Sequence, residues 1–457
     1  MVLFVVIYLV VTIVAGLLAA RLVKNSEDYL LAGRRLPIYM ATATLFATWF
    51  GSETILGASS EFAEGGLIAV VRDPFGAALC LLLVGLFFAR PLYRMKLLTL
   101  GDFYRKRYGK ITEFMASICI MLTYLAWIAA QLVAFGVIAA SLTGISIVNG
   151  ILLGTALVTA YTFIGGMWSV SVTDFLQMIF IIAGLVIASL EIAGLVSFRE
   201  LIQNAPEGFF RFTPELQSTE LFNYVAAWIT IGLGSVAGQD IFQRVMASKN
   251  EKVAVRASLI AAGMYLTVAM IPLMLALAGR HLLPHMLLPE NDPQMLIPQM
   301  ISQFTSLPVQ ILLFGALLSA ILSTASSALL APAAIMGENI LKPRFRIVSD
   351  KKLLLLSRLS VLVVAAIALA MALRRGNIYE LVGEAASVGL VSLFVPLTAG
   401  LFWKKANKTG AISSIIAGMV VWLIAEWAAT PVEGILFGLT ASFIAMITGS
   451  YLRPAQS

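Results

Sequence analysis

The sequence predicts an all-α polytopic membrane protein with about 13 transmembrane helices. Two observations lead to this fold class. Of the 457 residues, 60% are hydrophobic and 12% are charged, whereas roughly 25% of the residues in a soluble domain are charged. The apolar residues also gather in runs of about 20 residues, the length that an α-helix needs to cross a bilayer. This composition excludes a soluble enzyme and a disordered chain.

Thirteen apolar segments follow one another along the chain, and each is a candidate span, numbered here in chain order. They cover residues 2–20, 38–60, 74–92, 113–141, 147–164, 173–197, 222–241, 256–279, 308–338, 356–373, 379–402, 410–428 and 433–451. The first segment begins almost without basic residues and lacks a small-residue cleavage site. We therefore expect it to be retained as a span and not removed as a signal peptide.

Lysine and arginine are distributed unevenly between alternate loops. With the N-terminus outside, the inner loops hold 24 of these residues and the outer loops hold six. Because basic loops favour the cytoplasmic side, we expect the N-terminus outside and the C-terminus in the cytoplasm. Cys80 and Cys119 both lie in apolar runs, and the chain has only two histidines. We therefore expect no disulfide framework, no Cys/His catalytic site and no enzymatic activity.

Two apolar segments contain residues that interrupt a helix. In the second segment Gly51 and Ser52 stand beside Glu53, and in the seventh three glycines lie between residues 232 and 238. Each segment would begin a unit of five spans. Interruptions at corresponding positions are typical of a transporter binding site, since unwound backbone offers carbonyl and N–H groups where water is absent. Close helix packing through small residues is the alternative explanation.

Four hydroxyl-bearing residues cluster in the ninth segment. Ser323, Thr324, Ser326 and Ser327 have a spacing that gathers their hydroxyls on one side of a helix. Uncharged hydroxyl and carbonyl oxygens are hard donors that suit an alkali cation. The alternative is that these hydroxyls bond to their own helix and help it to pack.

Three carboxylates lie inside apolar segments. Asp174 stands near the start of the sixth segment, Glu53 in the second and Glu384 in the eleventh. Intramembrane carboxylates are functional candidates by default, because burying a charge in a bilayer is costly. Asp174 is either an interfacial residue or a cation ligand, and no basic partner stands near it in the sequence.

Together these motifs resemble the sodium:solute symporter family along nearly the whole chain. The matching motifs are FATWFGSE, AYTFIGG, SVTDFLQ, GQDIFQRVMASK, LSAILSTASSALL and SLFVPLTAGLFWKKANKTGA, in the expected order. The resemblance implies an inverted five-plus-five helix repeat, a LeuT-like core. Its two repeats would cover residues 37–220 and 221–408, after an extra span and inner loop (1–36) and before two C-terminal spans (409–457).

The resemblance also implies where sodium binds. One site would use the backbone carbonyls of Ala47, Phe50 and Ala320 and the hydroxyls of Ser323 and Thr324. Some relatives hold a second sodium ion. The side chains corresponding to that site are Asp174, Ser323, Ser326 and Ser327. Since all of them are present, we expect one Na⁺ and a second one beside it for each solute molecule.

The solute is predicted only by class. Within the family the chain looks nearest to the choline/proline-type branch, through ATWFG, GLFFARP and FQRV. Trp127 falls where choline transporters have an aromatic cage residue, and a quaternary ammonium binds such faces. Gly238 and Val382 stand where the other cage tryptophans are expected. In sugar members a carboxylate lies at the position of Glu53. The expected substrate-facing residues are Trp49, Gly51, Glu53, Thr54, Tyr124, Trp127, Gln131, Ser235 and Gln239.

The resemblance thus implies a sodium-coupled symporter that imports a small polar organic solute by alternating access. Its expected location is the bacterial inner membrane, with the solute, sodium and lipid as partners and without nucleic acid. A monomer would suffice for transport. Proton coupling through Asp174 or Glu53 remains an alternative, although the hydroxyl cluster favours sodium. A transporter-like solute sensor is the other alternative, while a channel would need polar stripes that these helices lack.

Overall fold

The computed structural model describes residues 2–23, 26–162, 167–215, 218–345, 350–374 and 377–452. Within these residues all regular elements are helical, apart from one isolated bridge between Leu36 and Ser248. The predicted all-α class is therefore confirmed. Several features used in the sequence analysis lie outside the described residues: 163–166 of the AYTFIGG motif, and the basic residues Lys24, Arg346, Arg375 and Arg453.

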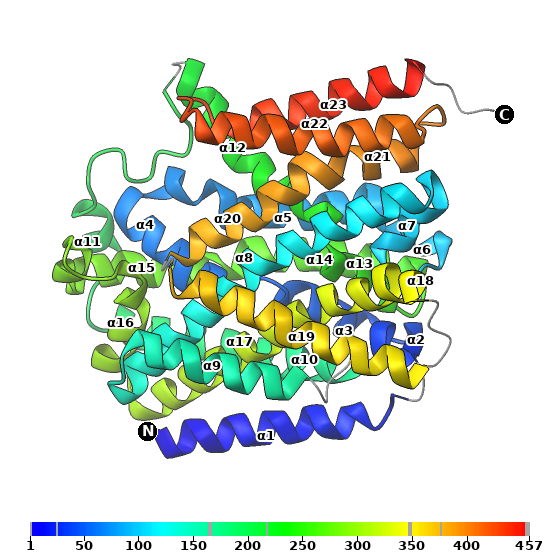
Figure 1. Ribbon diagram of the computed structural model, residues 1–457. Coiled ribbons are helices and arrows are strands. Elements are labelled where there is room, and N and C mark those ends of the chain that lie inside the picture. Colours follow the sequence, from blue (N-terminus) through cyan, green and yellow to red (C-terminus); the bar gives the residue numbers. More distant parts are fainter. Residues whose placement is uncertain are drawn as a thin grey trace.

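The N-terminal part of the chain forms eleven α-helices separated by short 3-10 and π-helical turns (Figure 1). The α-helices are α1 (Val2–Ala20), α2 (Ser26–Leu31), α3 (Ile38–Ala47), α4 (Ser59–Gly65), α5 (Ala77–Leu83), α6 (Ala89–Met95), α7 (Leu100–Tyr108), α8 (Lys110–Thr143), α9 (Ile147–Thr162), α10 (Met167–Ala193) and α11 (Phe198–Gln203). The short elements are η1 (Ala32–Arg34), η2 (Glu53–Ala58), η3 (Leu67–Val70), η4 (Val71–Gly76) and η5 (Val84–Phe88).

The C-terminal part continues in the same manner. Its α-helices are α12 (Ser218–Gly234), α13 (Gln239–Ala247), α14 (Glu251–Val268), α15 (Met270–Leu282), α16 (Leu296–Phe304), α17 (Leu307–Ile335), α18 (Lys342–Phe345), α19 (Asp350–Ala372), α20 (Ile378–Gly389), α21 (Val395–Phe402), α22 (Lys408–Trp427) and α23 (Gly434–Leu452). The short elements are η6 (Ser235–Ala237), η7 (Pro284–Leu287), η8 (Pro293–Met295), η9 (Met336–Leu341) and η10 (Leu390–Phe394).

Each of the 13 predicted apolar segments contains helix in its described residues. Nine helical stretches of the described chain are long and apolar enough to cross a membrane. They are Leu67–Met95, Lys110–Thr143, Met167–Ala193, Ser218–Ala237, Glu251–Leu282, Leu307–Phe345, Ile378–Phe402, Lys408–Trp427 and Gly434–Leu452. Shorter apolar helices, including α3 and part of α9 and α19, account for further predicted segments. The exact number of 13 spans stays a prediction.

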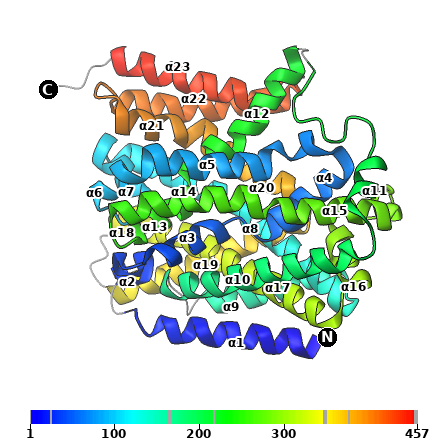
Figure 2. The ribbon, with the colours of Figure 1, turned by 180° about the vertical axis from the view of Figure 1, so that it is seen from behind.

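The helices surround a buried centre and are flanked on two sides by outer helices. The long helix α8 packs against α9, α17, α19 and α20, and most of its C-terminal half is buried. Helix α1 lies along one edge of the molecule beside α10 and α17, and the pair α22–α23 lies along the opposite edge (Figures 1 and 2). The first predicted span and the last two are therefore peripheral, and the core lies among the segments between them.

Both predicted interruptions are breaks in the helices. Helix α3 ends at Ala47, and the π-helix η2 begins only at Glu53 after a stretch of turns. Helix α12 ends at Gly234, the 3-10 turn η6 follows, and Gly238 is extended before α13 begins. A Cβ at Gly234 would overlap the carbonyl oxygen of Ala386 in α20. Glycine here therefore serves close packing as well as the break.

Basic side chains collect at one end of the bundle. Arg34 donates from Nε to Glu27 (2.7 Å) and from Nη2 to the carbonyl of Leu97 (2.9 Å). Arg107 donates from Nε to the carbonyl of Gly400 (3.0 Å), which fastens α7 to the end of α21. Helix α1 starts at the opposite end, and α23 finishes at this one (Figure 1). Such an arrangement is expected when the two termini lie on opposite sides of a membrane.

Arg244 corrects one part of the loop count. The predicted spans 222–241 and 256–279 leave Arg244 in the inner loop between them, but it lies in α13 and only 2% of its side chain is exposed. The reason is that the chain stays helical after the break at Gly238, so that α13 carries the arginine back into the core. Without Arg244 the inner loops still hold far more basic residues than the outer loops.

Candidate functional site

A cavity lies where the two broken helices face α8 and α20. Its lining is mostly aromatic or small: Trp49, Thr123, Tyr124, Trp127, Gly234, Ser235, Ala237, Gly238, Asp240, Val382, Ala385, Ala386 and Gly389. The first comes from the break after α3, the next three from α8, five from the break around η6, and the last four from α20. Breaks far apart in sequence thus meet at one central cavity, as expected of a solute site built from discontinuous helices.

Four of the nine expected substrate-facing residues line this cavity: Trp49, Tyr124, Trp127 and Ser235. The two positions where cage tryptophans were expected, Gly238 and Val382, line it too. The rings of Tyr124 and Trp127 lie 5.6 Å apart between centroids. The cavity therefore keeps part of an aromatic wall and has small or aliphatic residues where the rest would stand.

Glu53 lies behind this wall. The indole N–H of Trp127 donates to Glu53 Oε1, and the side-chain amide of Gln131 donates to the same oxygen at 3.1 Å. Ser52 donates to the amide oxygen of Gln131 at 2.7 Å. Only 4% of Glu53 is exposed. The carboxylate thus holds the edge of Trp127 in place, while the indole ring contributes to the cavity lining.

Thr54 belongs to a second buried cluster. Its hydroxyl donates to Asp73 Oδ2 at 2.8 Å, and the hydroxyl of Tyr265 donates to Asp73 Oδ1 at 2.9 Å. Asp73, in η4, is 2% exposed. Asp73 is not among the site residues expected from the sequence, although an aspartate before a proline at the start of an apolar segment is a signal for it. Both carboxylate oxygens are paired, which identifies this cluster as a structural link between η2, η4 and α14.

Asp240 is the carboxylate of the cavity lining. The hydroxyl of Tyr124 donates to Asp240 Oδ1 at 2.8 Å, and the backbone N–H of Asp240 donates back to the Tyr124 oxygen at 2.7 Å. Oδ2 of Asp240 is buried and accepts no hydrogen bond from any residue that the structure describes. The preceding residue, Gln239, faces away: its amide oxygen accepts from the backbone N–H of Leu100 at 2.7 Å. Gln239 is the residue expected from the sequence to face the solute, whereas Asp240 lines the cavity.

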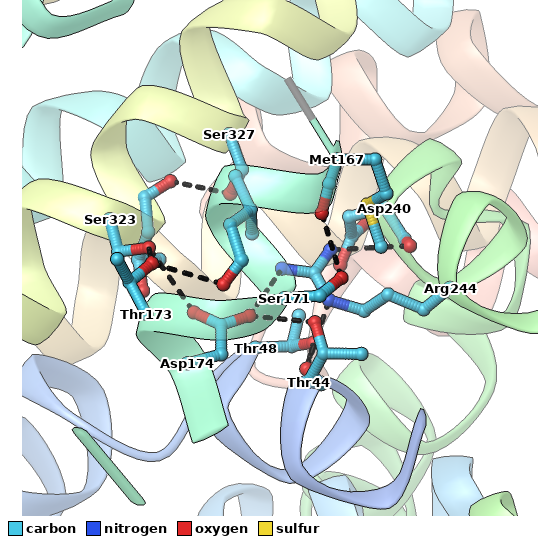
Figure 3. A network of polar contacts seen from close by, with 12 residues as sticks. Thr44, Thr48, Met167, Ser171, Thr173, Asp174, Asp240, Arg244, Ser323 and Ser327 are labelled. Carbon is cyan, nitrogen blue, oxygen red and sulfur yellow. Dashed lines mark hydrogen bonds and ion pairs between the residues drawn. The ribbon is translucent and has the colours of Figure 1, made fainter. Parts of the chain in front are cut away.

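The expected sodium ligands Asp174 and Ser323 lie together (Figure 3). Ser323 donates to Asp174 Oδ1 at 3.2 Å, and Thr44 donates to Asp174 Oδ2 at 2.6 Å. The hydroxyls of Thr173 and Ser323 lie 3.1 Å apart. Asp174 is 2% exposed. These residues join α3, α10 and α17 through oxygen atoms alone, the donor type that suits an alkali cation.

Arg244 is the basic partner that the sequence did not reveal for Asp174. Its Nη2 lies 3.8 Å from Asp174 Oδ2, its Nε donates to the carbonyl of Thr44 at 2.9 Å, and its Nη1 donates to the carbonyl of Asp240 at 3.3 Å. Figure 3 shows the guanidinium of Arg244 between Asp174 of α10 and Asp240 of α13. A partner 70 positions away could not be seen from neighbouring residues.

The other expected sodium ligands make separate contacts. Ser326 accepts from Thr162 of α9 at 3.3 Å, and Ser327 donates to the carbonyl of Thr324 at 2.9 Å. A Cβ at Gly51 would lie 3.8 Å from the Cβ of Ala320, so the break after α3 lies against α17. Ala47 ends α3 and Phe50 lies within the break. Across the described ranges, no group of three or more His, Cys, Asp or Glu residues could hold a metal ion.

Known proteins resemble this chain along most of its length. A model of the sodium:solute symporter family matches residues 29–418. Human high affinity choline transporter 1 is 26% identical over 434 residues, which cover 91% of this chain and 74% of that protein. The osmoregulated proline transporter OpuE of Bacillus subtilis is 28% identical over 473 residues, which cover 99% of this chain and 95% of the relative.

Solved structures share the fold. A substrate-bound, outward-open Na⁺-coupled sialic acid symporter aligns with a TM-score of 0.85 at 18% identity, covering 99% of this chain and 98% of the other. A nucleobase-cation-symport-1 family transporter in a closed conformation aligns with a TM-score of 0.63 at 17% identity, covering 94% and 96%. The predicted LeuT-like fold class is thereby confirmed.

Proposed function

The chain belongs to the sodium:solute symporter family, and from this premise we propose that it imports a small polar organic solute together with sodium. The observation that carries the proposal is the contact between Asp174 and Ser323 beside the break that follows α3. It brings a carboxylate and hydroxyls from three helices to the break that also borders the central cavity. Ion binding and solute binding therefore share one structural element.

The first sodium ion would bind the carbonyls of Ala47, Phe50 and Ala320 and the hydroxyls of Ser323 and Thr324. The contact of Gly51 with Ala320 supports this set, because it brings the break and α17 within reach of one ion. The second ion would bind at Asp174 with Ser323, Ser326 and Ser327. A sodium ion at Asp174 shares that carboxylate with Arg244, so the second ion is held more weakly than the first.

Transport follows from the order in which these parts are filled. Sodium from outside joins the break after α3 to α17 and stabilises the outward-open form. Solute then enters the cavity between the breaks, and the core rocks to release both inside. Moving one charge across about 100 mV yields about 2.3 kcal/mol, which sustains roughly a 50-fold solute gradient because about 1.4 kcal/mol corresponds to tenfold.

The same proposal includes the setting of the protein. It lies in the inner membrane of a bacterium, with the N-terminus outside and the C-terminus in the cytoplasm, surrounded by lipid. One monomer suffices for transport, and residues 37–220 and 221–408 form the two inverted repeats. Arg34 and Arg107 make their contacts in η1 and α7, at the end of the bundle where α23 finishes, which supports this orientation.

Proton coupling is the second candidate. Four of the buried carboxylates surround the cavity and the proposed sodium sites, at Glu53, Asp73, Asp174 and Asp240. Among the described residues Arg244 is the one lysine or arginine that is fully buried. A carboxylate without a cation partner is able to bind a proton in one state and release it in another. The hydroxyls around Asp174 support sodium instead, because a proton needs no such set of oxygen ligands.

A stability screen of the purified full chain in detergent separates these candidates. Choline, betaine, proline, other amino acids, sugars and organic acids are added in sodium and in potassium at equal ionic strength. A ligand that binds only the folded state raises the melting temperature. Stabilisation that needs sodium supports the proposal. Stabilisation that is equal in potassium and grows as the pH falls contradicts it and favours proton coupling.

A further inference from the structure

Asp240 borders the central cavity and has one carboxylate oxygen without a partner among the described residues. Asp240 is 6% exposed and lines the cavity, and its Oδ2 accepts no hydrogen bond from the described residues. Its other oxygen accepts from Tyr124. A buried carboxylate with an unpaired oxygen costs free energy unless a ligand supplies the missing donor or charge. Nothing in the proposed sodium sites uses this oxygen.

The buried ionisable groups around the cavity are mostly acidic. Glu53, Asp73, Asp174 and Asp240 are all buried in the core. Arg244 reaches only Asp174 by an ion pair, and it bonds Asp240 through the backbone carbonyl and not through the carboxylate. No lysine, arginine or histidine lines the cavity among the residues described. The Asp240 carboxylate therefore has Arg244 nearby but makes no ion pair or hydrogen bond with it.

We propose that Asp240 Oδ2 accepts a hydrogen bond from the ammonium group of a small organic cation, so that the solute is a protonated primary, secondary or tertiary amine. This inference rests on the proposed function, since it names the solute for the same cavity. The aromatic rings of Trp49, Tyr124 and Trp127 border the cavity and give the carbon-bound part of the cation a favourable surface.

The geometry disfavours a quaternary ammonium. Such a cation has no N–H group and depends on a surrounding set of aromatic faces, but Gly238 and Val382 leave two sides of the cavity without one. An N–H donor satisfies the free oxygen of Asp240 directly, and a charge-assisted hydrogen bond is stronger than a neutral one. Selectivity for an amine with N–H over its permethylated analogue follows.

The geometry also disfavours a solute carboxylate. Asp240 lies in the first turn of α13, where a helix otherwise attracts an anion through its N-terminal N–H groups. The backbone N–H of Asp240 is already donated to Tyr124. A zwitterion would therefore bring its carboxylate to an end of α13 that is already negative, without a basic side chain to receive it.

The test compares ligands that differ by one group. The purified full chain in sodium chloride is titrated with ethanolamine, N,N-dimethylethanolamine, choline, the neutral 3,3-dimethylbutan-1-ol and glycine betaine, and binding is followed by melting temperature and calorimetry. We expect the two amines to bind at least tenfold more tightly than choline, the neutral alcohol or betaine. Asp240→Asn should weaken amine binding at least tenfold and remove the preference over choline.

Two further variants and the response to sodium distinguish failure of the amine proposal from failure of the proposed symport. Asp240→Glu keeps the charge and should retain the preference for amines, whereas Asp73→Asn alters a paired carboxylate outside the cavity lining and should leave that preference in place. Stabilisation by sodium alone tests the proposed function separately. Loss of the sodium response in Asp240→Asn, or binding of choline or betaine as tight as that of the amines, overturns the proposal. Sodium stabilisation without binding of either amine overturns it as well and leaves the symporter intact.

Discussion

The hydroxyl of Thr44 donates a hydrogen bond to Asp174 at 2.6 Å, although the two residues are 130 positions apart in the sequence. This bond joins α3 to α10 close to the break that follows α3. The carbonyl of the same threonine accepts from Arg244 of α13. One residue of α3 therefore contacts both the carboxylate and the guanidinium of the ion pair. Any shift of α3 during transport changes both contacts together.

Ser323→Ala should weaken sodium binding. The substitution removes a hydroxyl that contacts Asp174 and Thr173, and a hydrogen bond to a charged group contributes about 1.5–3 kcal/mol. We expect the sodium concentration for half-maximal stabilisation to rise at least tenfold, and Thr324→Ala to act in the same direction. Thr440→Ala is the control, because that hydroxyl bonds to its own exposed helix. Unchanged sodium half-saturation in both variants would remove the assignment.

Arg244→Gln should make the protein less stable yet more responsive to sodium. Removing one member of a buried ion pair costs about 3–5 kcal/mol, and Asp174 is then left without its guanidinium. A sodium ion would supply the missing charge, so the rise in melting temperature on adding sodium should exceed that of the original chain. Arg107→Gln, which loses hydrogen bonds to backbone carbonyls and the stacking on Tyr108 but no ion pair with Asp174, should show the first effect without the second. An equal sodium response in both variants would contradict this account.

Trp127→Phe should lower stability while it keeps an aromatic face in the cavity. The indole N–H donates to the buried Glu53, and leaving such a carboxylate with fewer donors costs about 1–3 kcal/mol. Trp422→Phe is the matched control, since that indole N–H also donates to a glutamate, Glu426, but on the exposed surface of α22. The melting temperatures of the two variants test this prediction. An equal drop in melting temperature in both would contradict a structural role for the Trp127–Glu53 bond.

Gly234→Ala should impair folding or the closing of the core. The added methyl group would overlap the carbonyl of Ala386, and overpacking of this kind costs about 1–3 kcal/mol. Gly263→Ala in α14 is the control, because a Cβ there meets no atom within 4 Å. We expect the control to be as stable as the original chain or more so. Melting temperature and sodium-driven uptake in liposomes measure both effects, and a harmless Gly234→Ala would exclude a close contact between α12 and α20.

The sequence predicts those parts of the site that depend on residues lying close together in the chain. Interrupting glycines mark the break at Gly238, and the motif around Asp174 marks an intramembrane carboxylate. The choice between Gln239 and Asp240 depends on helix phase: neighbouring residues differ by about 100° around a helix, and the extended Gly238 resets that phase. Contacts such as Arg244 with Asp174 join distant segments, so no local spacing encodes them.

In the fold, too, local sequence patterns predict the helices but not the contacts between them. Hydropathy predicts where helices lie, because each apolar run must be buried in lipid or protein. It does not show which runs become peripheral: α1 and α22 are as apolar as core helices, yet they lie at opposite edges of the molecule. Partner choice depends on side-chain shape along whole helices, and short windows of sequence do not contain that information.

The surplus of buried carboxylates affects the half of the cycle in which nothing is carried. With the four carboxylates ionised, these acidic groups and the one guanidinium of Arg244 carry a net charge of −3, which the proposed sodium ions and cationic solute would balance. If the site empties of these cations, a cell interior that is electrically negative would repel it and drive its return to the outer face, with about 2.3 kcal/mol available per charge at about 100 mV. Membrane voltage would thus accelerate the reset of the carrier as well as the entry of sodium, and transient currents without solute should report this movement.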